Sequence, residues 1–338
     1  MGELTNKRWL DELRLGGALS YASVHGREVL YEGRYGTVVE RFRDDEGSYI
    51  YKPIGDPTTI GRELWVQREI VPALSQLRIP RIVASSATDI EGNGSVVASW
   101  LIYEDLGPLN HAHTADGLIK AAGWITQWHR LPLELVPATF AGHTPKLRDV
   151  VASLSTASLQ DIARWLDMDA AELENWQPWM QGGVTRIGDF EVVSHGDFHP
   201  YNIAIQHGDQ IVLDWEYVHR NHPCWDLYCL LDITSYRYAK VKLTQEQREA
   251  ALSSYWDRME LALIMQEDRM KPATSFEDIC ARYNLFATIY SAWIAGLIEG
   301  DLRRGDIPRE ALIRQRQETI EVFADCLQAL RAVGFEEK

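Results

Sequence analysis

Two short segments in the middle of the chain carry its strongest signal: SHGDFHPYN at residues 194–202 and IVLDWE at residues 211–216. Between them, two apolar runs flank a Gly-Asp pair at residues 208–209, which is typical of a β-hairpin. Antiparallel pairing folds the start of the first strand back beside the end of the second strand. We therefore expect Asn202 and Asp214 to lie side by side, although 12 positions separate them in the sequence.

This hairpin would bring three oxygen-bearing side chains together at one end of a short ribbon. Asp197 lies five positions before Asn202, on the loop that leads into the first strand. An amide oxygen beside a carboxylate suits a hard cation, so Asn202 and Asp214 are candidate ligands for Mg²⁺. A further carboxylate just outside the metal shell can accept a proton from an attacking hydroxyl, which makes Asp197 the candidate catalytic residue.

Two other interpretations of these segments explain less. Asp and Asn side chains favour turns, but turn chemistry accounts for none of the spacing. His195 and His199 have the i, i+4 spacing of a zinc hydrolase motif, which requires a helix. Gly196 and Pro200 argue against a helix at this place, so we expect a structural hydrogen bond from His195 rather than a metal bond.

A catalytic Asp, an Asn five residues later and a more distant metal-binding Asp form the layout of protein kinases. Here Gly196 replaces the Arg of the kinase H-R-D motif, and the Asp-Trp-Glu of residues 214–216 replaces D-F-G. With these changes the chain resembles the aminoglycoside phosphotransferase and choline kinase superfamily, whose loop reads H-G-D-x-H-x-x-N. The resemblance implies catalysis by Asp197 and bracing of the catalytic loop by Asp226, which begins a downstream Asp-Leu element.

The same resemblance extends to a short glycine loop near the N-terminus. The sequence GRYGTV at residues 33–38 resembles a reduced form of the loop that covers nucleotide phosphates in this superfamily. Gly33, Tyr35 and Gly36 are therefore implied to bind the nucleotide.

Further nucleotide contacts are implied by the residues that follow the glycine loop. Lys52, on the next expected strand, takes the place of the phosphate-contacting lysine, which a helical Glu holds in position. Glu69 is the expected partner of this lysine, and Glu63 is the less favoured choice. The sequence LIYEDLG resembles the family's hinge strand, so the backbone near Glu104 and Leu106 is implied to meet the adenine edge.

The chain changes from a mixed α/β pattern to a mostly helical one near residues 103–108. The first part has expected strands at 37–42, 48–53 and 96–103, and an expected helix at 60–77. Together with the resemblance, this predicts an α+β, two-lobed protein-kinase-like fold with a small N-terminal β-rich lobe and a larger, mostly helical C-terminal lobe. The expected domains are a nucleotide-binding lobe at 1–104 and a catalytic and substrate-binding lobe at 105–338.

The composition is that of a soluble globular protein, with 338 residues, 46% of them hydrophobic and 25% charged. The net charge of −15 argues against a nucleic-acid surface and is compatible with a cationic small substrate. No apolar run of membrane-spanning length is expected, and the N-terminus does not read as a secretory signal, so we expect no membrane and a cytoplasmic location. The four cysteines form no C-x-x-C pair.

The sequence therefore predicts a phosphotransferase with an alcohol group as acceptor, a small-molecule kinase that uses ATP or GTP and Mg²⁺. The resemblance favours an aminoglycoside phosphotransferase-like activity, and a choline, sugar or other metabolite kinase is the alternative within the superfamily. A protein substrate is not expected, because there is no A-P-E element and no H-R-D Arg. An alternative from another class is a non-catalytic nucleotide-binding protein of the same fold.

Overall fold

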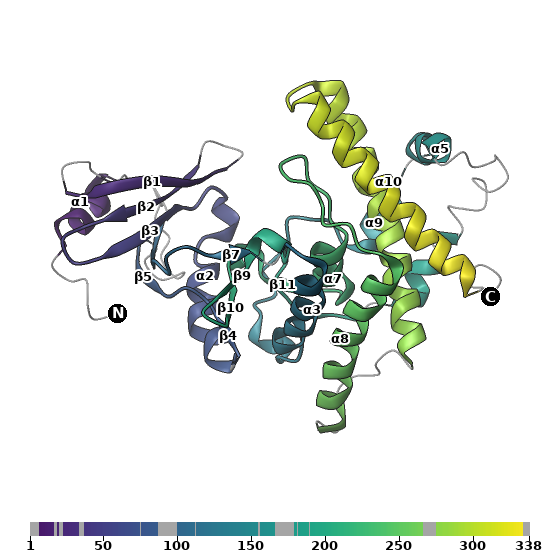
Figure 1. Ribbon diagram of the computed structural model, residues 1–338, viewed down its shortest axis with the longest axis horizontal. Coiled ribbons are helices and arrows are strands. Elements are labelled where there is room, and N and C mark those ends of the chain that lie inside the picture. The colour runs from purple at the N-terminus through teal and green to yellow at the C-terminus, as the bar shows by residue number, and fades with distance from the viewer. Residues whose placement is uncertain are drawn as a thin grey trace. The chain divides into compact units, whose positions relative to one another are not determined.

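The computed structural model describes residues 7–16, 19, 23–33, 37–74, 76–86, 100–111, 113–154, 156–165, 179–180, 182–188, 190–265 and 275–333. The chain forms two compact units (Figure 1): Met1–His111 with Asn202–Tyr217, and Ala112–Tyr201 with Val218–Lys338. The segment Asn202–Tyr217 thus belongs to the first unit, although the second unit surrounds it in the sequence. The division expected from the sequence, at residues 104 and 105, stays a prediction.

The first unit is built on a five-stranded antiparallel sheet. In order across the sheet, its strands are β1 (His25–Glu32), β2 (Val38–Arg43), β3 (Ser48–Pro53), β6 (Trp100–Glu104) and β5 (Ile82–Ser85). Helix α1 (Arg8–Gly16) packs against the sheet through Trp9, whose ring centroid lies 5.0 Å from that of Phe42 in an edge-to-face contact. The sequence predicted β2 and β3 but neither α1 nor the outer strands β1 and β5.

The helix expected over 60–77 is shorter and irregular. It begins as α2 (Arg62–Trp65), continues as a π-helical turn at Val66–Ile70 and ends as a 3₁₀ turn at Val71–Ala73. Pro72 has no backbone N–H to donate to the preceding turn, so a regular α-helix cannot continue through it. The irregular segment changes which side chains face the sheet.

The predicted hairpin is present and belongs to a second, four-stranded sheet. In order across this sheet, the strands are β4 (Leu77–Arg78), β10 (Asp209–Val212), β9 (Ile203–Gln206) and β7 (Asn110–His111). The hairpin turn lies at His207 and Gly208, whose φ angles of 51° and 92° are both positive, as in a type I′ turn. The turn is therefore one residue earlier than the expected Gly-Asp pair.

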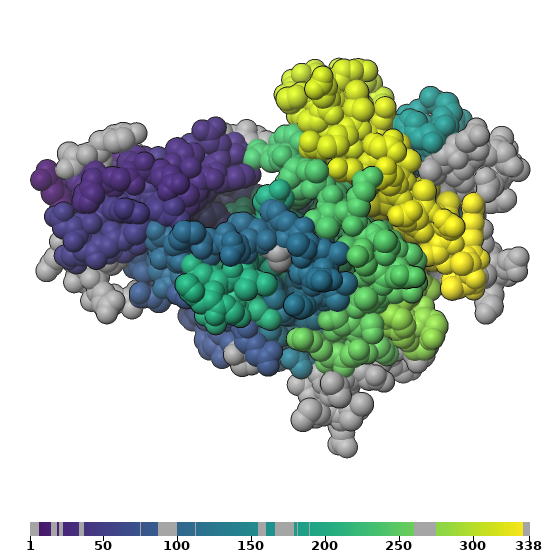
Figure 2. Space-filling view, in the orientation of Figure 1, coloured from purple at the N-terminus to yellow at the C-terminus, as the bar shows by residue number. Residues whose placement is uncertain are grey.

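The second unit is mostly helical. Its helices are α3 (Ala115–His129), α4 (Leu147–Ser153), α5 (Thr156–Trp165), α7 (Cys224–Leu231), α8 (Gln245–Met265), α9 (Phe276–Arg304) and α10 (Arg309–Ala332), and its two strands are β8 (Val192–Ser194) and β11 (His219–Asn221). Helix α10 runs along α9, and its outward face is visible in yellow in Figure 2. The two strands pair in an antiparallel ribbon that leads into the SHGDFHPYN segment.

Helix α9 departs from the expectation that no segment reaches the length of a membrane span. By length and composition it could cross a membrane, but 61% of its most apolar stretch is buried inside the protein. A helix at the centre of a globular unit gives the same signal, because it is apolar on several sides. We interpret α9 as a core helix of the second unit.

His222, just before α7, should make the stability of the protein depend on pH. Its ring stacks on Phe286 at 5.4 Å, and burial together with the positive charge of Arg282 lowers the pKa of His222 to about 3, from an ordinary value of 6.5. The unfolded chain therefore binds this proton first, so the stabilisation is complete above pH 6.5 and is lost as the pH falls towards 3. Each pH unit within this window should lower the free energy of unfolding by up to about 1.4 kcal/mol.

Urea unfolding at several pH values within this window checks the effect. The variant His222→Gln should show a weaker pH dependence than the unsubstituted protein, whereas His25→Gln, at an exposed position on β1, should not. An unchanged slope in His222→Gln would contradict this assignment.

Candidate active site

A lysine ammonium surrounded by carboxylates lies in the first unit. Lys52 Nζ, on β3, is 2.9 Å from Glu63 Oε2 of α2. The same atom is 2.5 Å from Asp214 Oδ1 and 3.2 Å from Glu216 Oε2, both in the segment that follows β10. Lys52 and Asp214 are 162 positions apart in the sequence, so the fold of this unit creates the cluster.

The charges of this cluster strongly shift its ionisation. Burial alone would lower the pKa of Lys52, but the charges of Asp214 and Glu63 outweigh it and raise the pKa well above its ordinary value, so the ammonium stays charged. Burial, with the neighbouring charge of Asp214, raises the pKa of Glu216 to about 7. The cluster therefore holds one charged ammonium and three carboxyl groups, of which Glu216 takes up a proton near neutral pH.

Glu69, the expected partner of Lys52, does not take part in this cluster. Its carboxylate pairs with Arg68 at 2.6 Å, in a largely exposed ion pair. Glu69 lies in the π-helical turn Val66–Ile70, whereas Glu63 is buried in α2. The partner of Lys52 is Glu63, which lies in the regular part of the helix.

Asn202 and Asp214 lie at the same end of the hairpin. The backbone N–H of Leu213 donates to the carbonyl of Asn202 at 2.9 Å, which extends the β9–β10 ladder by one pair. Asp214 comes next and has a left-handed backbone with φ of 61°, a conformation that Asp tolerates better than most residues. The chain therefore turns sharply at the residue that the sequence assigns to the metal.

The oxygen donors around Asp214 fit a divalent cation. Single ligand atoms of Glu63, Asp214 and Glu216 all lie within 4.8 Å of one another, and the backbone of Asn202 pairs with Leu213, the residue before Asp214. A set of carboxylate and amide oxygens is what Mg²⁺ prefers in proteins. The role of Asn202 and Asp214 as metal ligands stays a prediction, to which the structure adds Glu216 as a neighbouring carboxylate.

In the second unit, the buried carboxylate of Asp226 holds the backbone of the catalytic loop. Its Oδ1 accepts hydrogen bonds from the Ser194 hydroxyl at 2.7 Å and from the Gly196 N–H at 3.1 Å, and its Oδ2 accepts one from the His195 N–H at 2.9 Å. Asp226 is fully buried at the start of α7. One side chain thus fixes three consecutive residues just before Asp197.

Helix α3 supplies the remaining partners of the same carboxylate. Trp128 Nε1 donates to Asp226 Oδ2 at 2.8 Å, and His129 Nε2 lies 3.0 Å from this oxygen. Burial alone would raise the pKa of Asp226, but the contacts with His129 and Trp128 outweigh it and hold the pKa well below its usual range. Asp226 is therefore a buried anion that is fully hydrogen-bonded, which makes its burial tolerable.

Gly196 explains why this loop does not carry the Arg of H-R-D. Its φ is 87°, in the left-handed region that favours glycine. Its carbonyl accepts a hydrogen bond from Trp225 Nε1 at 2.8 Å, so buried groups surround both its N–H and its C=O. A long side chain at this position would strain the backbone and disturb this packing.

Asp197 follows Gly196 and is partly exposed. Its backbone N–H donates to His195 Nδ1 at 3.3 Å, and its Oδ2 lies 3.6 Å from His199 Nε2. His195 is fully buried and its ring contacts Phe198, so it acts as a structural support. The loop therefore orients the Asp197 carboxylate through its neighbours and leaves it accessible to a substrate.

The expected nucleotide contacts of the first unit are partly described. Gly33 N–H donates to the Thr37 carbonyl at 2.7 Å, and a Cβ at Gly33 would meet the Thr37 hydroxyl, so a larger residue there would force the Thr37 side chain to move. Tyr35 and Gly36 lie outside the described residues. Glu104 N–H donates to the Arg81 carbonyl at 2.9 Å.

The end of the expected hinge is fixed by the hairpin, because the Leu106 carbonyl accepts a hydrogen bond from the Gln206 side chain. The contact of Glu104 and Leu106 with adenine stays a prediction.

The fold and these residues define a protein-kinase-like phosphotransferase. The model of the phosphotransferase enzyme family (APH) matches residues 39–262, and the chain belongs to this family. The protein is accordingly a small-molecule kinase that acts on a hydroxyl acceptor. No curated protein sequence matches the chain.

Several solved structures share the fold at low sequence identity. A choline/ethanolamine kinase family protein from Mesorhizobium loti has a TM-score of 0.57 and 14% identity, with 96% of this chain and 99% of that chain covered. The GDP complex of wild-type aminoglycoside 2'-phosphotransferase-IIIa has a TM-score of 0.57 and 12% identity, with coverage of 94% and 99%. An ethanolamine kinase from Plasmodium vivax has a TM-score of 0.56 and 12% identity, with coverage of 91% and 84%. These likenesses confirm the predicted fold class.

The structure also shows residues near the site that sequence reasoning missed or ranked low. Glu216 joins the Lys52 cluster, and its position two residues after Asp214 was the available signal. Trp128 and His129 are direct partners of Asp226, a contact between residues about 97 positions apart that the local sequence does not show. Nothing in the local sequence distinguishes Glu63 from Glu69, because both lie in one expected helix.

A matched pair of glutamate variants tests the assignment of the Lys52 partner. Glu63→Gln should raise the KM for the nucleotide and lower kcat/KM by about one order of magnitude or more, because the ammonium loses a charged partner that orients it. Glu69→Gln should leave both constants unchanged, since its carboxylate pairs only with an exposed Arg. Steady-state kinetics with the nucleotide as the varied substrate gives KM and kcat/KM for both variants. A larger effect in Glu69→Gln than in Glu63→Gln would refute the assignment of Glu63 as the partner of Lys52.

Proposed function

We propose that the protein transfers the γ-phosphate of ATP or GTP to a hydroxyl of a small molecule, with Mg²⁺ as the metal. The observation that carries this proposal is the ion-pair cluster of Lys52 with Glu63 and Asp214. It joins a strand lysine to a helix glutamate and to the aspartate after the hairpin, three parts that kinases use to bind nucleotide phosphates and metal. A purely structural ion pair would not need a surplus of carboxylates around one lysine.

The hairpin end and the cluster would hold the metal through Asn202 and Asp214. Bound Mg²⁺ supplies positive charge that offsets the charge on the transferring phosphate oxygens. Lys52 holds its ammonium near the same place and can contact the α- and β-phosphates. Gly33, at the start of the glycine loop, has no side chain to keep its backbone away from the phosphates.

Asp197 orients the acceptor hydroxyl and takes its proton late in the reaction. In a loose transition state the hydroxyl needs little activation, so positioning contributes more than basicity. The hydrogen bonds to Asp226 and the packing of Phe198 support this positioning, because they fix the backbone on either side of Asp197. The full set of Asp197, Asn202, Asp214 and Lys52 favours an active kinase over a non-catalytic nucleotide-binding protein.

The choice of nucleotide rests on relatives alone. Aminoglycoside 2'-phosphotransferase-IIIa is solved with GDP, and an amicoumacin kinase is solved with AMP-PNP, so both guanine and adenine nucleotides bind to proteins of this fold. We therefore propose either ATP or GTP as donor. Product release in a coupled assay with each nucleotide decides between them.

The variant Asp197→Asn tests the catalytic assignment. It should lower kcat by about two to four orders of magnitude, because the amide can no longer accept the hydroxyl proton. The affinity for the Mg²⁺–nucleotide complex should barely change, since the role proposed for Asp197 is towards the acceptor hydroxyl. A coupled assay of nucleoside diphosphate release measures kcat, and a calorimetric titration measures the affinity for the Mg²⁺–nucleotide complex.

Asp209→Asn, at an exposed position of the hairpin, is the matched control and should keep full activity. Unchanged turnover in Asp197→Asn would remove Asp197 from the mechanism.

A further inference from the structure

A cavity of about 300 Å³ lies in the second unit, next to the catalytic loop. Its walls come from the end of the loop, from α3, from α7 and from the segment that follows α7; they include Pro200, Tyr201, Leu118, Leu230, Ile233 and Tyr238. This volume is at the lower end of the range for small-molecule sites, which are mostly apolar. The cavity is therefore large enough for part of an acceptor molecule.

Aromatic contacts connect this cavity to the catalytic carboxylate. Tyr201 and Tyr238, both on the cavity wall, stack at 4.3 Å between ring centroids. His199 lies 5.7 Å from the ring of Tyr238 and its Nε2 is 3.6 Å from Asp197 Oδ2. A molecule seated in the cavity would thus lie one side chain away from Asp197, within the same unit.

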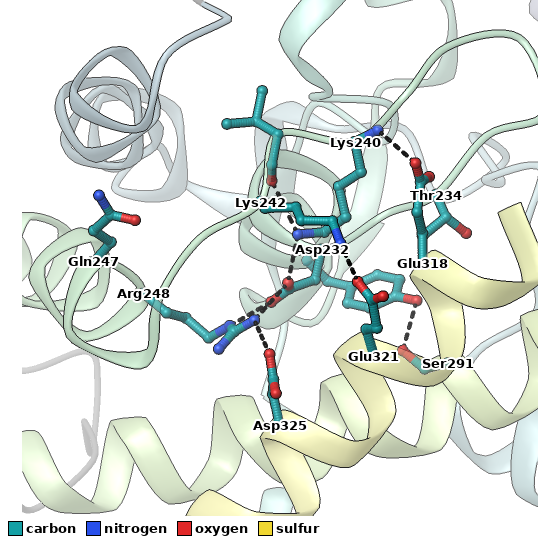
Figure 3. A network of polar contacts seen from close by, with 12 residues as sticks. Asp232, Thr234, Lys240, Lys242, Gln247, Arg248, Ser291, Glu318, Glu321 and Asp325 are labelled. Atoms are coloured by element: carbon teal, nitrogen blue, oxygen red, sulfur yellow. Dashed lines mark hydrogen bonds and ion pairs between the residues drawn. The ribbon is translucent and has the colours of Figure 1, made fainter. Parts of the chain in front are cut away.

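The charges around the cavity do not suit a cationic ligand. None of the described residues that line it is acidic, and Lys240 is the lining residue with a permanent charge. The Lys240 ammonium is directed at the buried carboxylate of Asp232, 3.2 Å away, and donates to the Val241 carbonyl (Figure 3). An amine on the ligand would find no carboxylate among the described residues of the cavity wall.

The carboxylate of Asp232 is also engaged by other groups. Arg248 binds both of its oxygens, at 2.9 and 3.0 Å, and the Tyr283 hydroxyl donates to it. Asp325 lies 3.8 Å from Arg248 on the far side of this network. Asp232 and Asp325 thus face Arg248 and Lys240. Glu318 of α10 also joins this network, where its Oε1 accepts a hydrogen bond from the Lys240 backbone N–H, but it is not among the described residues that line the cavity.

Aromatic rings can bind cations through their faces, which would suit a quaternary ammonium group. In this wall, however, the rings of Tyr201 and Tyr238 are tilted by 37° with centroids 4.3 Å apart, and the His113 ring lies 4.2 Å from that of Tyr201, so these rings already contact one another and a histidine. The lining that remains is mostly aliphatic, from Leu118, Leu230 and Ile233. Such a surface gains from burying apolar area and loses from burying an unpaired charge.

We infer that this cavity receives the body of the acceptor, and that this body is apolar and uncharged rather than a polyamine or a quaternary ammonium. The inference rests on the proposed function, since it concerns the molecule that Asp197 deprotonates. It also opposes the expectation that the acidic composition of the chain reflects a cationic substrate. The charge is spread over the whole chain, whereas the lining of the cavity decides which ligand enters.

Calorimetric titration without nucleotide tests this inference with two probes, biphenylmethanol and its aminomethyl derivative, which adds one positive charge. The unsubstituted protein should bind the neutral probe at least about tenfold more tightly. Ala239→Asp places a carboxylate at an exposed position of the cavity wall and should strengthen binding of the aminomethyl probe about tenfold while leaving the neutral probe unchanged. Ala250→Asp, the same substitution at an exposed position of α8 outside the wall, should change neither.

Tighter binding of the aminomethyl probe to the unsubstituted protein, no binding of either probe, or equal responses of the two Asp variants would each overturn the inference. The binding measurement does not depend on phosphate transfer. A protein that binds the neutral probe selectively but transfers phosphate to no acceptor would support the cavity assignment and contradict the proposed function. A protein that phosphorylates acceptors but fails the binding test would support the proposed function and contradict the cavity assignment.

Discussion

The hydrogen bond from the Leu213 N–H to the Asn202 carbonyl is the constraint on which the predicted metal site depends. It closes the open end of a hairpin whose other end is set by a type I′ turn, so the register between the two strands has no freedom to slip. A slip of one residue would turn Asp214 to the other face of the ribbon. The polar end of the hairpin then meets Lys52, and this contact links the hairpin to the five-stranded sheet.

The catalytic loop depends on a separate hydrogen-bond network in the second unit. The buried carboxylate of Asp226 accepts the N–H groups of the loop, and the ends of α3 and α7 hold that carboxylate in place. A buried carboxylate with every lone pair used is costly to disturb, because removal of any partner leaves an unpaired polar group. The protein thus holds this short loop through a network of hydrogen bonds, together with the buried ring of Phe198, which packs against Trp128.

The sequence predicted those parts of the site that depend on local geometry. Asn202 and Asp214 could be paired because 12 residues and one tight turn define a hairpin without reference to the rest of the chain. Glu63 could not be preferred over Glu69, because the choice depends on a helix that changes from α to π to 3₁₀ within a few turns. The cavity beside Asp197 was not foreseen at all, since its walls come from segments between residues 113 and 241 that meet only in the folded unit.

Binding of ATP with and without Mg²⁺ to the variant Asp214→Asn tests the central claim most directly. Asn keeps the shape of the side chain and tolerates a left-handed backbone, but it lacks the charge that a divalent cation requires. The unsubstituted protein should bind Mg²⁺–ATP more tightly than metal-free ATP, and in Asp214→Asn this advantage should shrink by at least about tenfold. An advantage of the same size in both proteins would show that the hairpin end does not hold the metal.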